Sequence, residues 1–212
     1  MRQNMIDVLK KFGYRVYWQV LNTKDHGIPQ NRPRFYLVAI EGKSQCHLFR
    51  FPPSIDPEPI ENFMEKDVRQ QELTTDTQKT ALNAAKKKLK KKGIDSSMVN
   101  AFVDVGATPK WSSAMVGTCP CLTSSRCKMG GHYSTVAKRM LTRKEMLRLQ
   151  GIPPNRFNYK TAGVKEDDLK FAVGNATSTN VLMRLLPDAL WAAGLLEKKI
   201  VLPTRFSKYV CY

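Results

Sequence analysis

The sequence LNTKDHGIPQNRPRFYLVAI spans Leu21 to Ile40 and joins a polar loop to an apolar run. The run begins at Arg34 and is rich in aromatic and β-branched residues, which predicts a strand. Because side chains alternate along a strand, Gln30, Arg32 and Arg34 would share one face, where two guanidiniums and an amide converge. Such donors suit a phosphate or a base carbonyl. On spacing alone, a surface position with the arginines paired to acids is the alternative.

The residues before this stretch predict one helix and one strand. Apolar residues recur at helical spacing from Met5 to Phe12, so residues 2–12 should form an amphipathic helix that ends at Gly13. Tyr14–Val20 has the composition of a strand. A helix followed by two strands is typical of the end of an α/β sheet, and we therefore expect this sheet to be incomplete.

The rest of the chain predicts an irregular middle section and a helical C-terminal part. Four prolines between Phe51 and Pro59 prevent regular structure and indicate a domain boundary. Beyond it we expect a helix at Thr77–Lys92 that ends at Gly93, and then loops with short strands at Thr108–Ser134. The capping box of Thr142 and Glu145 predicts the start of a helix that runs through Leu149. A last helix is expected at about Ser178–Leu196, and Pro187 could kink it.

Composition restricts the class of protein and its partner. Hydrophobic residues make up 42% of the chain, and no run approaches the roughly 18 apolar residues of a membrane span, so we expect a soluble protein without a membrane partner. A net charge of +17 favours a polyanionic partner, and residues 76–150 hold 15 basic against 4 acidic side chains. Five irregularly spaced cysteines indicate reduced thiols in an intracellular protein.

The densest charge is a run of six lysines between Lys86 and Lys92. The run could contact phosphates directly, or it could be a solvated helix end or a nuclear-import signal, and the sequence does not separate these interpretations. We expect the protein in the nucleus if its source is eukaryotic, and in the cytoplasm otherwise.

Three segments resemble motifs of one enzyme family, the DNA cytosine-5 methyltransferases. Leu21–Ile40 resembles motif VIII, whose pattern Gln-x-Arg-x-Arg after Gly-x-Pro is matched at all three positions. RMLTRKEMLRLQGIP, at Arg139–Pro153, resembles motif IX, and FAVGNATSTNVLMRLLP, at Phe171–Pro187, resembles motif X. The three follow the family's order, and the resemblance covers residues 1–40 and 139–196, with the interval between them matched in position and size.

The resemblance implies an α/β fold class, the C-terminal part of a Rossmann-like methyltransferase fold that binds S-adenosylmethionine. Residues 1–44 would end the catalytic α/β domain, residues 45–138 would form a small, irregular target-recognition domain, and residues 139–212 would return to the catalytic domain. The run of six lysines would then lie in the part that reads double-stranded DNA.

The resemblance also implies a chemistry. In this family a cysteine thiolate adds to C6 of a cytosine turned out of the duplex, and C5 then takes a methyl group from S-adenosylmethionine. Gln30, Arg32 and Arg34 would lie in the catalytic pocket, where the arginines hold the base and act as permanent donors at O2 or N3. Asn175 and Ala176 would line the cofactor site.

The middle region supplies candidate contacts to bases or phosphates. They are Thr123, Ser124, Ser125, Arg126, Lys128 and His132, with Gly130 and Gly131 allowing close backbone approach. In motif IX we interpret Arg139, Thr142, Glu145 and Arg148 as structural residues that hold the recognition domain against the catalytic one.

Three family motifs are absent from the 212 residues: the Phe-x-Gly-x-Gly cofactor loop, the Pro-Cys-Gln nucleophile loop and the Glu-Asn-Val motif. Pro120 and Cys121 mimic the nucleophile, but Leu122 replaces the glutamine and the position falls between motifs VIII and IX, so we reject Cys121 as the nucleophile. No metal site is predicted, because the spacing of Cys119, Cys121, Cys127 and His132 differs from the usual zinc-binding pairs.

The missing motifs leave three hypotheses open. The chain is expected to be a fragment or one subunit of a split methyltransferase, inactive alone and completed by a second polypeptide with the N-terminal motifs. It could instead be a non-catalytic DNA-binding or regulatory remnant of the family. A third hypothesis keeps the chemistry and makes transfer RNA the substrate.

Overall fold

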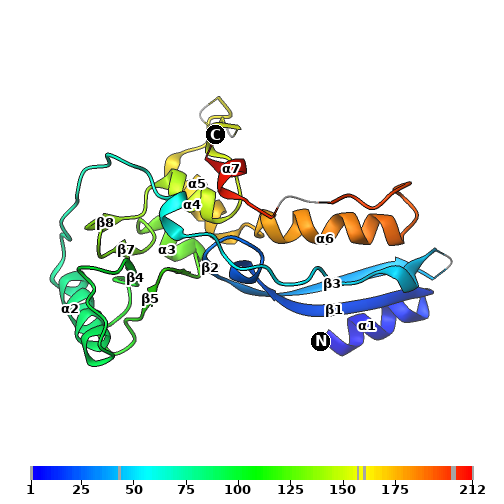
Figure 1. Ribbon diagram of the computed structural model, residues 1–212, viewed down its shortest axis with the longest axis horizontal. Helices are drawn as coiled ribbons and strands as arrows, with labels where there is room; N and C mark the ends of the chain where they lie inside the picture. Colours follow the sequence, from blue (N-terminus) through cyan, green and yellow to red (C-terminus); the bar gives the residue numbers. More distant parts are fainter. Residues whose placement is uncertain (1, 43, 157, 160, 202–203, 212) are drawn as a thin grey trace.

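The computed structural model describes residues 2–42, 44–156, 158–159, 161–201 and 204–211 (Figure 1). At one end of the molecule, α1 (Arg2–Lys11) turns through Gly13 into a long antiparallel hairpin of β1 (Tyr14–Asn22) and β3 (Pro33–Glu41). Gly13 has a φ of 84°, a left-handed conformation that favours glycine. The expected helix and both strands are therefore confirmed.

One long helix of the C-terminal part, α6 (Thr179–Ala192), packs on the hairpin. Figure 1 shows the hairpin lying between α6 and α1. The short 3-10 helix η2 (Cys46–Leu48) completes this layer. The shared core consists of Leu21, Tyr36, Ile40, Cys46, Phe49, Val181, Leu185 and Ala192. Motif VIII and motif X, about 150 residues apart in sequence, thus pack directly against each other.

The centre of the molecule joins segments from all parts of the chain. The first 3-10 turn, η1 (Thr23–Asp25), leads to β2 (Gln30–Asn31), which pairs in parallel with β6 (Cys119–Pro120). The elements around this pair are α3 (Ser124–Lys128), α4 (Arg143–Leu149), α5 (Glu166–Asn175), α7 (Ser207–Val210), η3 (Ile60–Phe63) and η4 (Pro154–Arg156). Their common core includes Ile28, Phe63, Leu122, Leu149, Val173 and Phe206.

The other end of the molecule is a small helix-and-sheet unit (Figure 1). Helix α2 (Asp76–Lys91) lies beside an antiparallel sheet in the order β5 (Ala114–Val116), β4 (Ala101–Val103), β7 (Tyr133–Ser134) and β8 (Arg139–Met140). Leu82 and Ala85 of the helix pack with Val103 and Tyr133 of the sheet. All of this unit except β8 falls within residues 45–138, which are expected to form the recognition domain.

Several element limits differ from the predictions. Helix α2 begins at Asp76 because Thr75 and Gln78 form a capping box. Helix α6 contains Pro187 and ends at Ala192, several residues before the expected Leu196. Helix α5 was not expected, since in its ten residues only Leu169, Val173 and Gly174 are buried. No helix within the described ranges is both long and apolar enough to cross a bilayer.

Candidate functional site

Gln30 is the centre of a buried hydrogen-bond junction. Its Nε2 donates to the carbonyl of Leu149 at 2.7 Å, and its Oε1 accepts from the backbone nitrogen of Leu122 at 3.2 Å. The side chain has no exposed surface. Gln30 therefore ties β2 to the segment after β6 and to the end of α4, which is a structural role.

Arg32 lies on the same face and is also buried, with 3% of its surface exposed. Its Nη2 donates to the carbonyls of Gly174 at 3.1 Å and Ala176 at 2.7 Å, and its Nη1 donates to the carbonyl of Leu122. Burial lowers the pKa of Arg32, and nearby Cys121 partly opposes this effect. Because its terminal nitrogens are bound to backbone carbonyls, Arg32 is not available to donate to a base in this arrangement. This differs from the expectation that Arg32 holds the base.

Arg34 has a different environment from Arg32. It is half-buried, its Nη1 donates to the carbonyl of Pro33 at 2.8 Å, and its Nη2 lies 3.4 Å from the Sγ of Cys121. Arg32 Nη1 reaches the same sulfur at 3.4 Å. Because Gln30, Arg32 and Arg34 all contact residues 121–122, the prediction that they share one face is confirmed.

A cavity of about 380 Å³ lies beside Arg34. Asn175, which is exposed, and Ala176, which is half-buried, line it with Thr177. The remaining lining residues are Arg32, Phe35, Tyr36, Leu37 and Leu182. The structure thus brings the expected base-holding arginines and the expected cofactor residues to one cavity.

The candidate DNA contacts fall into two groups. Thr123, Ser125 and Lys128 are exposed, whereas Ser124 is half-buried. Arg126 is half-buried and donates to Asp104 at 3.0 Å and to the carbonyl of Gly106 at 3.1 Å. These five remain candidates by position, although Arg126 would have to share or exchange its partners.

His132 does not lie at the surface and is removed from the candidate DNA contacts. Only 1% of it is exposed, and its Nε2 lies 3.4 Å from the carbonyl oxygen of Cys121. Burial lowers its pKa, so the neutral ring is favoured. The polar loop composition around it gave no signal of this burial.

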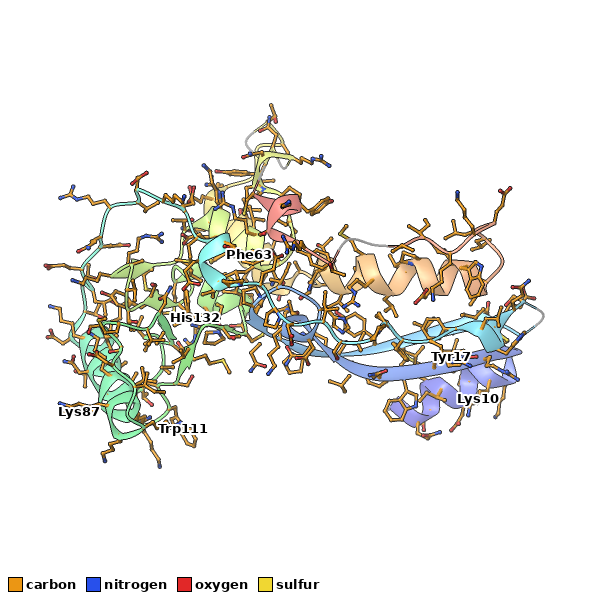
Figure 2. All side chains as sticks on the ribbon, viewed as in Figure 1. Lys10, Tyr17, Phe63, Lys87, Trp111 and His132 are labelled. Carbon is orange, nitrogen blue, oxygen red and sulfur yellow. The ribbon has the colours of Figure 1, made fainter. Side chains whose placement is uncertain are left out.

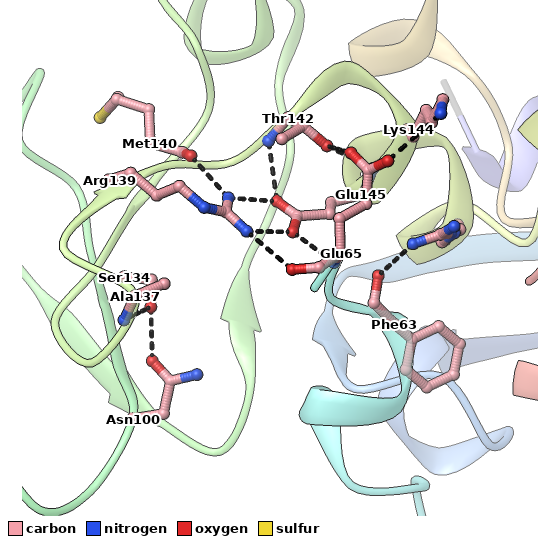
Figure 3. A network of polar contacts seen from close by, with 11 residues as sticks. Phe63, Glu65, Asn100, Ser134, Ala137, Arg139, Met140, Thr142, Lys144 and Glu145 are labelled. Atoms are coloured by element: carbon pink, nitrogen blue, oxygen red, sulfur yellow. Dashed lines mark hydrogen bonds and ion pairs between the residues drawn. The ribbon is translucent and has the colours of Figure 1, made fainter. Parts of the chain in front are cut away.

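The residues of motif IX form a buried structural network (Figure 3). Arg139 and Glu145 form a bidentate ion pair, with nitrogen–oxygen distances of 2.8 and 2.7 Å. Glu145 also accepts from the backbone nitrogen of Glu65 at 2.7 Å, and Glu65 accepts from the hydroxyl of Thr142 at 2.6 Å. Arg148 donates to the carbonyl of Phe63 at 3.4 Å. The structural interpretation of these residues is confirmed, and Glu65 is a partner that the sequence analysis missed.

The family described as C-5 cytosine-specific DNA methylase matches residues 1–190. This chain belongs to that family. Among the curated relatives of this chain, the type II methyltransferase M.NgoBI of Neisseria gonorrhoeae is 33% identical over 84% of this chain and 51% of its own length. M.HaeII of Haemophilus aegyptius is 31% identical over 92% of this chain and 56% of its own. The chain spans about half the length of these relatives.

Solved structures support the α/β methyltransferase fold for this chain. The Dnmt2 methyltransferase of S. pombe matches 90% of this chain and 62% of its own, with a TM-score of 0.57 and 15% sequence identity. The methyltransferase EhMeth of Entamoeba histolytica matches 89% of this chain and 57% of its own, with a TM-score of 0.57 and 16% identity. At these identities the likeness concerns the fold alone.

Cys119 and Cys127, two cysteines of this methylase-family chain, are buried near the site. Burial raises the pKa of Cys119 strongly and that of Cys127 to about 12, so both are neutral thiols. Within the described residues, no three His, Cys, Asp or Glu side chains are grouped to hold a metal ion.

Proposed function

We propose that this chain supplies the base-holding and DNA-reading part of a DNA (cytosine-5-)-methyltransferase. One observation carries the proposal: Arg34 lies at the cavity that Asn175 and Ala176 also line, while Arg32 is anchored beside it on three backbone carbonyls. A half-buried guanidinium beside an opening is suited to donate to a flipped base. Membership of the family supports cytosine in DNA as that base.

Each motif VIII residue has a distinct task in this proposal. Arg34 donates to O2 or N3 of the cytosine and stabilises the charge that develops when a thiolate adds to C6. Arg32 and Gln30 are positioning residues, since their hydrogen bonds hold β2 and the start of β3 against residues 121–122 and 174–176. A guanidinium is permanently charged in proteins, so a base-holding arginine needs no proton transfer to act.

The cavity fits one side of a bound S-adenosylmethionine. Asn175 and Thr177 offer polar groups, and Leu182 with Phe35 offers apolar surface. Its lining contains no carboxylate that could receive ribose hydroxyls. We therefore infer that the cofactor, which supplies the methyl group, is held mainly by residues outside this chain.

The nucleophilic thiolate is likewise proposed to come from a polypeptide with the Pro-Cys-Gln motif. Cys121 is the residue that could imitate it, but its sulfur contacts both arginines, and Cys121 does not line the cavity. In the proposed reaction Cys121 takes no part. Thr123, Ser124, Arg126 and Lys128 are proposed to contact DNA near the flipped base.

A reconstitution experiment tests the proposal. The chain alone should transfer no label from methyl-labelled S-adenosylmethionine to cytosine in DNA, and the chain mixed with a protein that carries the N-terminal motifs should do so. R34Q should lower turnover of the mixture by about 100-fold, the effect of removing one transition-state donor. The exposed arginine of the control R205Q should be dispensable.

Two outcomes would overturn parts of this proposal. Methyl transfer by the chain alone would contradict the external nucleophile, and C121S would then abolish it, because a hydroxyl cannot replace the thiolate. Tight DNA binding without methyl transfer in any mixture would instead favour a regulatory protein.

A further inference from the structure

Helix α2 presents its lysines on the face opposite the protein core. Ala81, Leu82, Ala85 and Leu89 are buried, which is one helical stripe. Lys86, Lys87 and Lys90 are exposed and line a hollow of about 600 Å³ at the C-terminal half of the helix. In the described part of the chain, none of these three lysines forms an ion pair with an acidic group.

Lys88 differs from its neighbours because it holds a loop. Its Nζ donates to the carbonyls of Ser112 at 2.9 Å, Lys110 at 3.1 Å and Pro109 at 3.4 Å. This loop carries Trp111, which is 73% exposed, and the ammonium of Lys110 lies 5.5 Å from the centre of its ring. Lys88 therefore fixes an exposed aromatic ring and a further cation beside α2.

Helix stability alone does not account for this surface. Lysines in the last turn complement the negative end of a helix, which would explain Lys90. Lys86 and Lys87 lie a turn earlier, and an exposed tryptophan adds nothing to that effect. The hollow has one carboxylate in its lining, Asp95, which already accepts from the backbone nitrogen and the hydroxyl of Ser97 at 2.8 and 2.7 Å.

We propose that Lys86, Lys87 and Lys90, together with Trp111, form a second, sequence-independent contact to duplex DNA outside the recognition sequence. Ammonium groups on flexible stems act as point charges toward phosphates, and contacts to phosphates carry no sequence information. Helix α2 lies at one end of the molecule, whereas β2, next to the cavity, lies in the middle (Figure 1). The phosphates that α2 contacts would therefore belong to DNA that flanks the recognition sequence. The inference rests on the proposed function, since it takes DNA as the substrate.

The salt dependence of DNA binding tests the lysines. Each phosphate contact contributes about 0.9 to the slope of log affinity against log salt. The triple variant K86Q/K87Q/K90Q of the full chain should therefore lower the slope for a mixed-sequence 30-base-pair duplex by up to about 3 units. The matched control K10Q/K11Q/K198Q changes three exposed lysines on α1 and on the loop after α6 and should leave the slope unchanged.

Tryptophan fluorescence tests the aromatic part of the surface. Figure 2 shows Lys87 and Trp111 at the same end of the molecule and Lys10 at the other. Duplex DNA should quench the emission of the wild type, and W111F should lose most of that quenching while Trp18 and Trp191 remain. K88Q, which frees the loop, should reduce the quenching although Lys88 is not itself proposed to touch DNA.

The outcomes separate this inference from the function on which it rests. Unchanged salt slopes in the triple variant, with DNA binding intact, would overturn the α2 surface and leave the methyltransferase proposal standing. A loss of affinity for transfer RNA but not for the duplex would also overturn it, by assigning the surface to RNA. Failure of the wild type to bind DNA at all would contradict both.

Discussion

At the scale of single residues, two arginines two positions apart have opposite environments. Arg32 satisfies three carbonyls from segments about 90 and 140 residues away, whereas Arg34 binds one neighbouring carbonyl and one sulfur. We expect R32A to lower the free energy of unfolding by about 3 kcal/mol, because buried carbonyls lose their donors. R34Q should change it by less than about 1 kcal/mol. Urea unfolding of both variants checks this, and equal losses would contradict the division of roles.

At the same scale, His26 makes the stability of the folded chain depend on pH. Burial and then the charge of Arg184, whose Nη1 lies 3.0 Å from Nδ1, lower the pKa of His26 from 6.5 to about 4, against the opposing effect of Asp25. Between these values the unfolded chain binds a proton that the folded chain does not, so stability falls as the pH falls from about 6.5 to about 4. The full shift corresponds to about 3 kcal/mol.

The H26Q variant isolates this contribution. Its unfolding free energy should change less between about pH 7.5 and pH 4.5 than that of the wild type, because glutamine does not titrate. An identical pH dependence in the two proteins would show that another group is responsible.

At the scale of elements, Gly174 sets how closely α5 and α3 approach. A methyl group at Gly174 would overlap the backbone of Thr123 and Ser124 at the start of α3. We expect G174A to destabilise the chain by about 2 kcal/mol, since backbone atoms cannot move aside as a flexible side chain can. A172S, on an exposed position of α5, is the control. A thermal midpoint of G174A equal to that of A172S would show that α3 and α5 can move apart without loss of stability.

At the scale of the whole molecule, the hairpin end exposes apolar side chains. Val8 on α1 is 50% exposed, Phe12 in the turn after α1 is 76% exposed, and Val20 on β1 is 55% exposed. A two-stranded sheet with such a surface is marginal without further packing. We expect the unfolding midpoint to rise when a protein with the N-terminal methyltransferase motifs is added, because a ligand of the folded state stabilises it.

Surface variants test where that partner binds. F12K should abolish the rise in midpoint, whereas M98K, at an equally exposed methionine near the far end of α2, should preserve it. A midpoint that does not respond to the partner would contradict a split enzyme.

The sequence by itself determined the local features of this protein. Period-two spacing brought Gln30, Arg32 and Arg34 to one face, the capping box of Thr142 and Glu145 opened α4, and the motif order identified the family, because each depends on neighbouring residues or on linear order. Only the tertiary structure decided which arginine remains available, that His132 is buried, that Glu65 completes the motif IX network and that Lys88 holds the loop of Trp111. These depend on contacts between residues about 10 to 140 positions apart, and burial and hydrogen-bond partners at such separations follow from packing rather than from any local pattern.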